Sequence, residues 1–208
     1  MSKRLNKYLI ELRHKAIRFE RIDINGKSSD NWFINNQRRI ICSLVAIILT
    51  SLLVEGFNEQ FISYSSTILS ILIGLFITAM IFSFDKFYTK IDREKANANE
   101  KLWNTQSYNY SMQFAYITGY NIVLSIFTLV VLSLSVFFDV IMSINVWGYH
   151  FEFDKISADT FLNFIGLSLL LLQRFIVLYW IACIVYNTLF LVSSMVQYMT
   201  VKIDRQDD

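Results

Sequence analysis

Arg174 is the residue whose type and position point most directly to chemistry. It interrupts an otherwise apolar run over 161–184, with Gln173 beside it and Asn163 about three helical turns earlier. An arginine at the middle of a bilayer costs roughly 2.5–3.5 kcal/mol on insertion scales, so such residues usually face a bundle interior, a water path or a partner. We therefore predict that Arg174, Gln173 and Asn163 form an intramembrane polar group that serves a pore or signalling.

A second register is open for Arg174. The stretch 175–196 is itself of spanning length, and choosing it would move Arg174 to the outer interface. The apolar residues 161–172 would then project into water. This consequence favours the register over 161–184, in which Arg174 is buried in the membrane.

The outer loop 139–160 contains a second group of polar residues. Alternation in the sequence Tyr-His-Phe-Glu-Phe-Asp over 149–154 puts His150, Glu152 and Asp154 on one face of an extended strand. Imidazole and carboxylate are suitable metal ligands, but no fourth ligand confirms such a site, and a solvated strand face is the alternative. With Trp147 nearby, we predict an outer sensing loop and no metal site.

Other catalytic signatures are missing from the sequence. The two histidines, His14 and His150, fall on opposite sides of the membrane in the topology derived below. No glycine-rich phosphate loop, metalloprotease spacing or pair of intramembrane carboxylates occurs. We expect neither an enzyme nor a cofactor-binding protein.

Four long apolar runs position these residues, namely 40–54, 61–84, 117–138 and 161–184. A spanning helix needs about 20 mostly apolar residues, and runs without polar alternation exclude barrel strands. With 54% hydrophobic residues, 17% charged residues and no proline in 208 positions, the chain is predicted to be an all-α polytopic membrane protein. The first run is short and reaches spanning length only if its helix begins near Arg39.

The loop charges give the orientation. Segment 1–39 carries ten basic residues and 85–115 carries five, whereas 55–60 has none and 139–160 has one lysine against four acids. Basic residues concentrate in cytoplasmic loops. We therefore predict four transmembrane helices, with cytoplasmic helical extensions and both termini cytoplasmic.

Residues 3–21 are predicted to form a basic amphipathic helix, because apolar residues recur at spacings of three and four. The helix either lies on the anionic inner leaflet or docks a soluble partner. Direct nucleic-acid binding is not expected, since aromatic interleaving is missing. The basic residues assigned to this surface are Lys3, Arg4, Lys7, Arg13, Lys15, Arg18 and Arg21.

The remaining segments complete the predicted organisation. Residues 85–104 are expected to extend the second span into the cytoplasm and 106–116 to lead back, which forms a helical hairpin, with a disordered loop as the alternative. Cys42 and Cys183 are expected to be buried apolar fillers at similar depth. The predicted regions are 1–38, the first two spans within 39–84, the hairpin 85–116, the last two spans within 117–184, and the helix end and tail 185–208.

Four spans, both termini inside and a basic helix before Trp32 and Phe33 resemble, as an architecture covering the whole chain, the membrane subunit family KwaA of Kiwa anti-phage defence systems. The resemblance rests on no short motif, and no functional residue is carried over from it. It implies a homo-oligomer in the bacterial inner (plasma) membrane, with a tetramer expected, that senses disturbance of the envelope by phage. It also implies a soluble, DNA-binding cytoplasmic effector of the KwaB type as the partner.

Two functions are therefore compatible with the sequence. A compact outer surface, a helical membrane body and a large basic inner surface suit a sensor or anchor that recruits a cytoplasmic effector. The alternative is an oligomeric ion channel or membrane-disrupting effector in which Arg174 lines the path. We expect Arg174→Leu to change ion flux in a channel, and deletion of 1–22 to change partner recruitment in an anchor.

Overall fold

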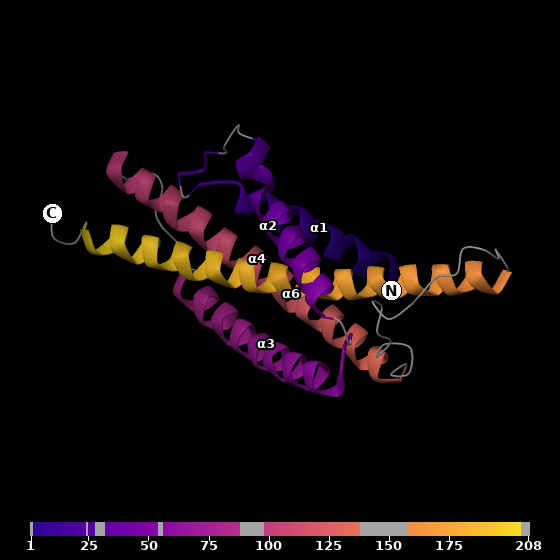
Figure 1. The fold of residues 1–208 in the computed structure, drawn as a ribbon. Helices are drawn as coiled ribbons and strands as arrows, with labels where there is room; N and C mark the ends of the chain where they lie inside the picture. The colour runs from indigo at the N-terminus through magenta and orange to yellow at the C-terminus, as the bar shows by residue number, and fades with distance from the viewer. Residues whose placement is uncertain are drawn as a thin grey trace. The chain divides into compact units, whose positions relative to one another are not determined.

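The computed structural model describes residues 2–23, 25–27, 32–53, 56–87, 98–137 and 158–204. This part of the chain contains five helices and no strand (Figure 1). The prediction of an all-α chain is confirmed for these residues. The helices are α1 (Ser2–Glu20), α2 (Trp32–Leu52), α3 (Glu59–Phe87), α4 (Ala98–Phe137) and α6 (Ala158–Asp204).

Three helices of the described chain are long and apolar enough to cross a membrane. The candidate spans are Glu59–Ile81 in α3, Lys101–Ser135 in α4 and Phe164–Thr200 in α6. The coarse prediction of a protein with membrane-spanning helices is therefore supported by length and composition. α2 is not among the three, because its polar start leaves only 40–52 as apolar helix, about 20 Å against a hydrocarbon core of about 30 Å.

The boundary between α3 and α4 differs from the expectation. The second span was expected to continue to residue 104, but α3 ends at Phe87 and 98–104 form the first turns of α4. No glycine or proline lies between 85 and 104 to mark a helix end, so the sequence does not locate this boundary. The connection 88–97 lies outside the described residues.

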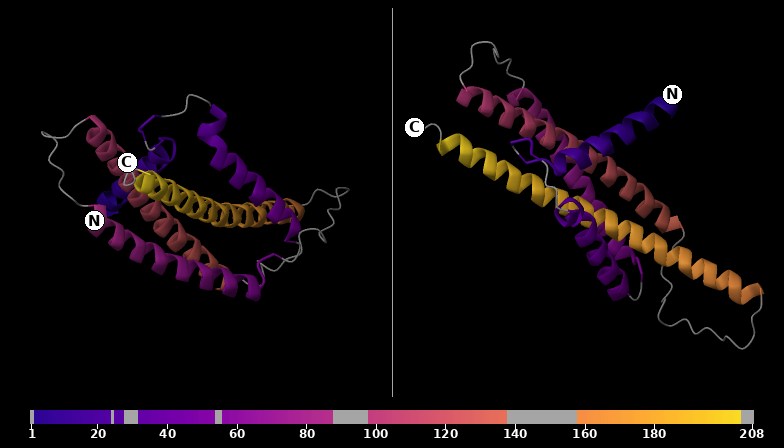
Figure 2. Two further views of the ribbon diagram at one scale, coloured as in Figure 1. Left: turned by 90° about the vertical axis from the view of Figure 1, so that its left-hand side faces the viewer. Right: turned by 90° about the horizontal axis from the view of Figure 1, so that it is seen from above.

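The chain divides into two compact units, each of which takes part of the long helices. Unit 1 comprises residues 1–37, 72–123 and 185–208, and unit 2 comprises 38–71 and 124–184. α4 and α6 contribute to both units and run without a break (Figure 2). At 1.5 Å per residue, their 40 and 47 residues correspond to about 60 and 70 Å.

In unit 1, the first part of α4 and the last part of α6 pack antiparallel. Three hydrogen-bonded pairs establish the direction, because the α6 number rises as the α4 number falls: Asn121 with Asn187, Gln113 with Ser194, and Ser107 with Tyr198. Tyr198 also stacks on Tyr110 with ring centroids 4.5 Å apart and on Trp103 at 5.4 Å.

In unit 2, packing is mainly apolar, with side chains from four helices in the core. Its buried residues are Cys42, Ala46, Phe57, Ile62, Leu69, Leu124, Leu132, Leu170, Val177, Leu178, Cys183 and Ile184. α3 begins here with a local cap, because the side-chain oxygen of Asn58 accepts a hydrogen bond from the Phe61 N–H at 2.8 Å. The buried Phe57 ring stacks on Phe61, which fixes the entry of the chain into α3.

Three hydroxyl groups of α3 are satisfied within their own helix. Thr67, Ser70 and Thr78 of α3 each donate to the carbonyl four residues earlier, at 2.8–2.9 Å. A hydroxyl bonded in this way is tolerated in lipid, where no water would accept its proton. The polar residues of α3 are therefore compatible with a membrane-spanning helix.

Candidate functional site

The N-terminal segment docks on α4 in unit 1, where four side-chain hydrogen bonds link residues that are distant in the sequence. The ammonium group of Lys15 donates to the Tyr116 hydroxyl at 3.2 Å and lies 5.1 Å from the centre of that ring. Phe19 stacks on the same ring at 5.4 Å. Tyr116 therefore holds α1 by an apolar contact and a polar contact at once.

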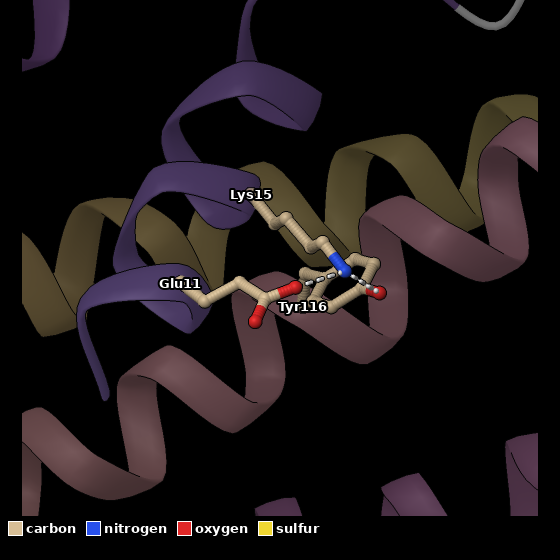
Figure 3. A network of polar contacts seen from close by, with 3 residues as sticks. All are labelled: Glu11, Lys15 and Tyr116. Carbon is tan, nitrogen blue, oxygen red and sulfur yellow. Dashed lines mark hydrogen bonds and ion pairs between the residues drawn. The ribbon is translucent and has the colours of Figure 1, made fainter. Parts of the chain in front are cut away.

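Lys15 also forms an ion pair with Glu11, one turn earlier on α1, at 2.8 Å (Figure 3). A hydrogen bond and attraction from Lys15 lower the pKa of Glu11, and hydrogen bonds to Glu11 and Tyr116 raise the pKa of Lys15. Both side chains are close to half exposed, so solvent weakens the pair. The pair orients Lys15 toward Tyr116 and contributes little energy by itself.

Gln113 is the most connected buried side chain at this junction. It is 3% exposed, and its amide nitrogen donates to the carbonyl oxygens of Phe19, at 2.9 Å, and Ile22. The last carbonyls of a helix have no partner within the helix, so Gln113 satisfies the end of α1. Its amide oxygen accepts a hydrogen bond from Ser194 of α6 at 3.4 Å. One glutamine thus joins α1, α4 and α6.

The turn after α1 docks farther along the same helix. Gln106 of α4 donates to the side-chain oxygen of Asn25 at 2.6 Å. Gly26 has φ +81 and its missing Cβ would lie 3.2 Å from Asn109, so a side chain here would meet both backbone strain and a tight contact. α4 therefore contacts the N-terminal segment from Gln106 to Gly119. A Cβ atom added at Gly119 would lie 3.5 Å from the Leu12 side chain of α1, which is an ordinary van der Waals distance.

A buried polar pair connects α4 and α6 inside the candidate spans. Asn187 donates to Asn121 at 2.7 Å, and the two residues are 1% and 0% exposed. Among the described residues, the Asn121 amide nitrogen and the nearby Thr118 hydroxyl have no hydrogen-bond partner. Such a pair fixes the register of two helices in an apolar surrounding more than it adds stability.

Arg174 is buried in unit 2. It is 1% exposed and is the largest fully buried side chain of the described chain. Its neighbour Gln173 donates to Ser135 of α4 at 3.1 Å, and the side chain of Asn163 lies outside the described residues. Because α6 is continuous over 158–204, its extent does not choose between the two spanning registers. The two cysteines of this unit, Cys42 and Cys183, are buried and form no disulfide bond.

The predicted basic surface of α1 is solvent-facing for the most part. Arg4, Lys7, Arg13 and Arg18 are exposed, Lys15 and Arg21 are half-buried, and the side chain of Lys3 lies outside the description. The outer-loop residues Trp147, His150, Glu152 and Asp154 also lie outside the described residues. Among the residues that are described, no group of three His, Cys, Asp or Glu side chains is placed to hold a metal ion.

The structure brings out functional candidates that the sequence patterns did not single out: Gln113, Tyr116, Asn121 and Asn187. A polar residue inside or beside an apolar run was the available signal, and the prediction used it only for Arg174, Gln173 and Asn163. The described residues thus define an all-helical protein with three candidate membrane-spanning helices, which indicates a membrane location. Comparison with protein-family models, curated proteins and solved structures finds no match for this chain.

Proposed function

We propose that this protein is a membrane-embedded sensor and anchor subunit of a bacterial anti-phage defence complex. In this proposal it oligomerises in the inner membrane and recruits a soluble cytoplasmic effector. The observation that carries the sensor and anchor role is the assembly, in unit 1, of the N-terminal segment with the first part of α4 and the last part of α6. The link to defence rests on the architectural resemblance to the KwaA family.

Contacts in unit 1 support four crossings. Asn25 lies against Gln106, near the start of α4, so the N-terminal segment is on the side where α3 ends and α4 begins. If α3 crosses the membrane, its first residue is on the other side, and the chain must cross once between 27 and 59. α2 is the helix available for that crossing, in spite of its short apolar part.

The same contacts support a shared side for the two termini. Tyr198, near the end of α6, bonds Ser107 and stacks on Trp103. Ser107 and Trp103 belong to the segment 85–115, whose sequence contains five basic residues, and the N-terminal segment that docks on α4 belongs to 1–39, whose sequence contains ten. The distribution of basic residues assigns this side to the cytoplasm.

Helix length supports a relay through the bilayer. α4 and α6, at about 60 and 70 Å, exceed the hydrocarbon core of about 30 Å, so a large part of each stands outside it. Polar and aromatic contacts hold the cytoplasmic parts of the two helices in one register. A displacement at the outer ends of α4 and α6 therefore reaches a cytoplasmic surface without passing through a loop.

Two further parts of the proposal concern assembly and activity. α3 leaves Tyr64, Ile68, Ile71 and Leu75 exposed along one face, with 11% of its span buried, so lipid or another copy of the chain must cover it. We propose that another copy of the chain covers this face in a homo-oligomer, and that the oligomer is a tetramer. The role proposed is non-enzymatic.

The burial of Arg174 weighs against the channel alternative. A side chain that lines a path between subunits is exposed in a single chain, whereas Arg174 is 1% exposed. We therefore propose that Arg174 holds unit 2 together, and we keep conduction as the competing outcome of the experiment.

The test is native mass measurement of the tagged protein, expressed with its neighbouring genes and purified in mild detergent. We expect a defined oligomer that carries a soluble second chain. Leu102→Ser with Tyr108→Ser, which changes exposed residues of the cytoplasmic part of α4, should reduce retention of that chain by about tenfold or more. Leu134→Ser, an exposed position in the apolar part of the same helix, is the matched control.

Two results would overturn the proposal. An oligomer that carries no companion and conducts ions in liposomes would establish the channel. Retention of the soluble chain that is equally reduced in the Leu134→Ser control would show that recruitment does not use the α4 surface.

A further inference from the structure

α1 is covered along only half of its apolar stripe. Leu12, Ala16 and Phe19 continue the spacing that begins at Leu5 and Tyr8. Ala16 is 1% exposed and Phe19 stacks on Tyr116, whereas Leu5 and Tyr8 are 58% and 65% exposed. The stripe therefore extends beyond the part that α4 covers.

The exposed surface of α1 is strongly basic along the length of the helix. Arg4, Lys7, Arg13 and Arg18 are exposed, and between residues 2 and 19 the one acidic residue is Glu11, whose carboxylate is paired with Lys15. An uncovered apolar stripe flanked by cations is the pattern of a helix that lies in the interface of an anionic membrane.

The residues of α4 that contact α1 lie where the sequence of α4 changes from polar to apolar. Its contacts on α4 run from Gln113 to Gly119. In the same interval α4 changes from the polar sequence of 98–113 to the apolar run that begins at Ile117. A helix enters the hydrocarbon core at such a change, and aromatic residues such as Tyr116 gather at that level. Residues 12–19 of α1 are thus held at this level. Because α1 runs antiparallel to α4 here, Leu5 and Tyr8 lie toward the apolar part of α4, and the long side chains of Arg4 and Lys7 would extend back to the headgroups.

We propose that α1 is a binding surface for anionic phospholipid headgroups, with Leu5 and Tyr8 entering the interface and Arg4 and Lys7 contacting the phosphates. Charge complementarity and the depth of docking favour lipid over a soluble acidic protein as the occupant. The surface is independent of the proposed function, because an anchor and a channel would use it equally.

The experiment uses the full chain in nanodiscs, with an environment-sensitive fluorophore attached at Tyr8→Cys. Quenching by a lipid with a shallow nitroxide is compared between purely zwitterionic discs and discs with one third phosphatidylglycerol. Each basic residue near an anionic surface changes the partition by about fivefold. We expect quenching to rise at least about threefold with phosphatidylglycerol and to return to the zwitterionic level at high salt.

Arg4→Gln with Lys7→Gln should abolish the rise. Both side chains are exposed, so the packing of α1 on α4 is retained. The matched control is Lys27→Gln with Lys101→Gln, two exposed lysines of unit 1 outside α1, and it should keep the full rise. Equal quenching in the two lipids would overturn the proposal. Protection of the label by a co-purified soluble chain in phosphatidylglycerol discs would also overturn it and would make that chain the occupant.

Discussion

The two parts of the α4–α6 helix pair are held by different chemistry. In unit 1, the pair is joined by Asn121–Asn187, Gln113–Ser194 and Ser107–Tyr198, together with a stack of aromatic rings. In unit 2, Gln173 of α6 donates a hydrogen bond to Ser135 of α4, and apolar side chains form most of the core.

This difference indicates what each part contributes. Directional hydrogen bonds fix which residue of α4 faces which residue of α6, whereas apolar packing tolerates small shifts. The register of the pair is therefore set in unit 1, where the N-terminal segment also docks. Unit 2 supplies burial and encloses Arg174.

The largest effect is expected for Arg174→Ala, which tests whether unit 2 depends on its buried arginine. Truncation leaves a cavity and removes the donor from its polar neighbours, so we expect a loss of about 3 kcal/mol or more. Thermal unfolding in detergent measures it. Gln173→Ala, which removes one hydrogen bond at the adjacent position, should cost about 1 kcal/mol.

Unchanged stability of Arg174→Ala together with altered ion conductance would reverse this account of unit 2. Arg174 would then line an ion path and would not stabilise the core of unit 2.

The second prediction concerns the junction in unit 1. Gln113→Leu removes the donor to the carbonyls of Phe19 and Ile22, and each buried carbonyl left without a partner costs about 1–3 kcal/mol. We expect hydrogen exchange in 2–27 to rise strongly while α3 is unaffected. Thr105→Ala, an exposed position on the same helix, is the control. If exchange in 2–27 does not change, α1 is held by Tyr116 and apolar contacts alone.

The third prediction tests whether the asparagine pair sets the register. Asn187→Leu and Asn121→Leu should each destabilise the protein, with a coupling energy of about 0.6–1.7 kcal/mol in a double-mutant cycle. The double variant should recover part of the loss, because no buried amide is then left alone. Additive losses would mean that the two amides do not act as a pair.

The positions of the helices could be predicted from the sequence more reliably than the contacts between them. Apolar spacing predicted a helix over 3–21, and the observed helix is Ser2–Glu20. The apolar runs 61–84 and 161–184 lie within α3 and α6, and residues 40–52 and 117–137 of the other two runs lie within α2 and α4. In contrast, Gln113 meets Phe19 and Ile22 across more than 90 residues of chain, and no local pattern records such a pairing. Arg174 could be predicted as a site residue because a charged side chain in an apolar run is rare. An uncharged amide such as Asn121 is a weaker signal.

The smallest effect is expected from titrating the Glu11–Lys15 pair, which tests how much of the α1 docking is electrostatic. The pKa of Glu11 is lowered in the folded protein, so its contribution is present above the unfolded-state pKa and is lost as the pH falls through the lowered value. The pKa of Lys15 is raised, so its contribution is present below the unfolded-state pKa and is lost as the pH rises through the raised value.

Between these limits the docking of α1 should not depend on pH, and outside them it should weaken only slightly, because both groups are solvent-accessible. The carbon-13 shift of the Glu11 carboxyl group, followed by NMR, measures the acid limb. In Lys15→Gln its midpoint should move up toward the ordinary glutamate value, since the cation that lowers it is gone. A large loss of docking near neutral pH would instead require a titrating group other than this pair.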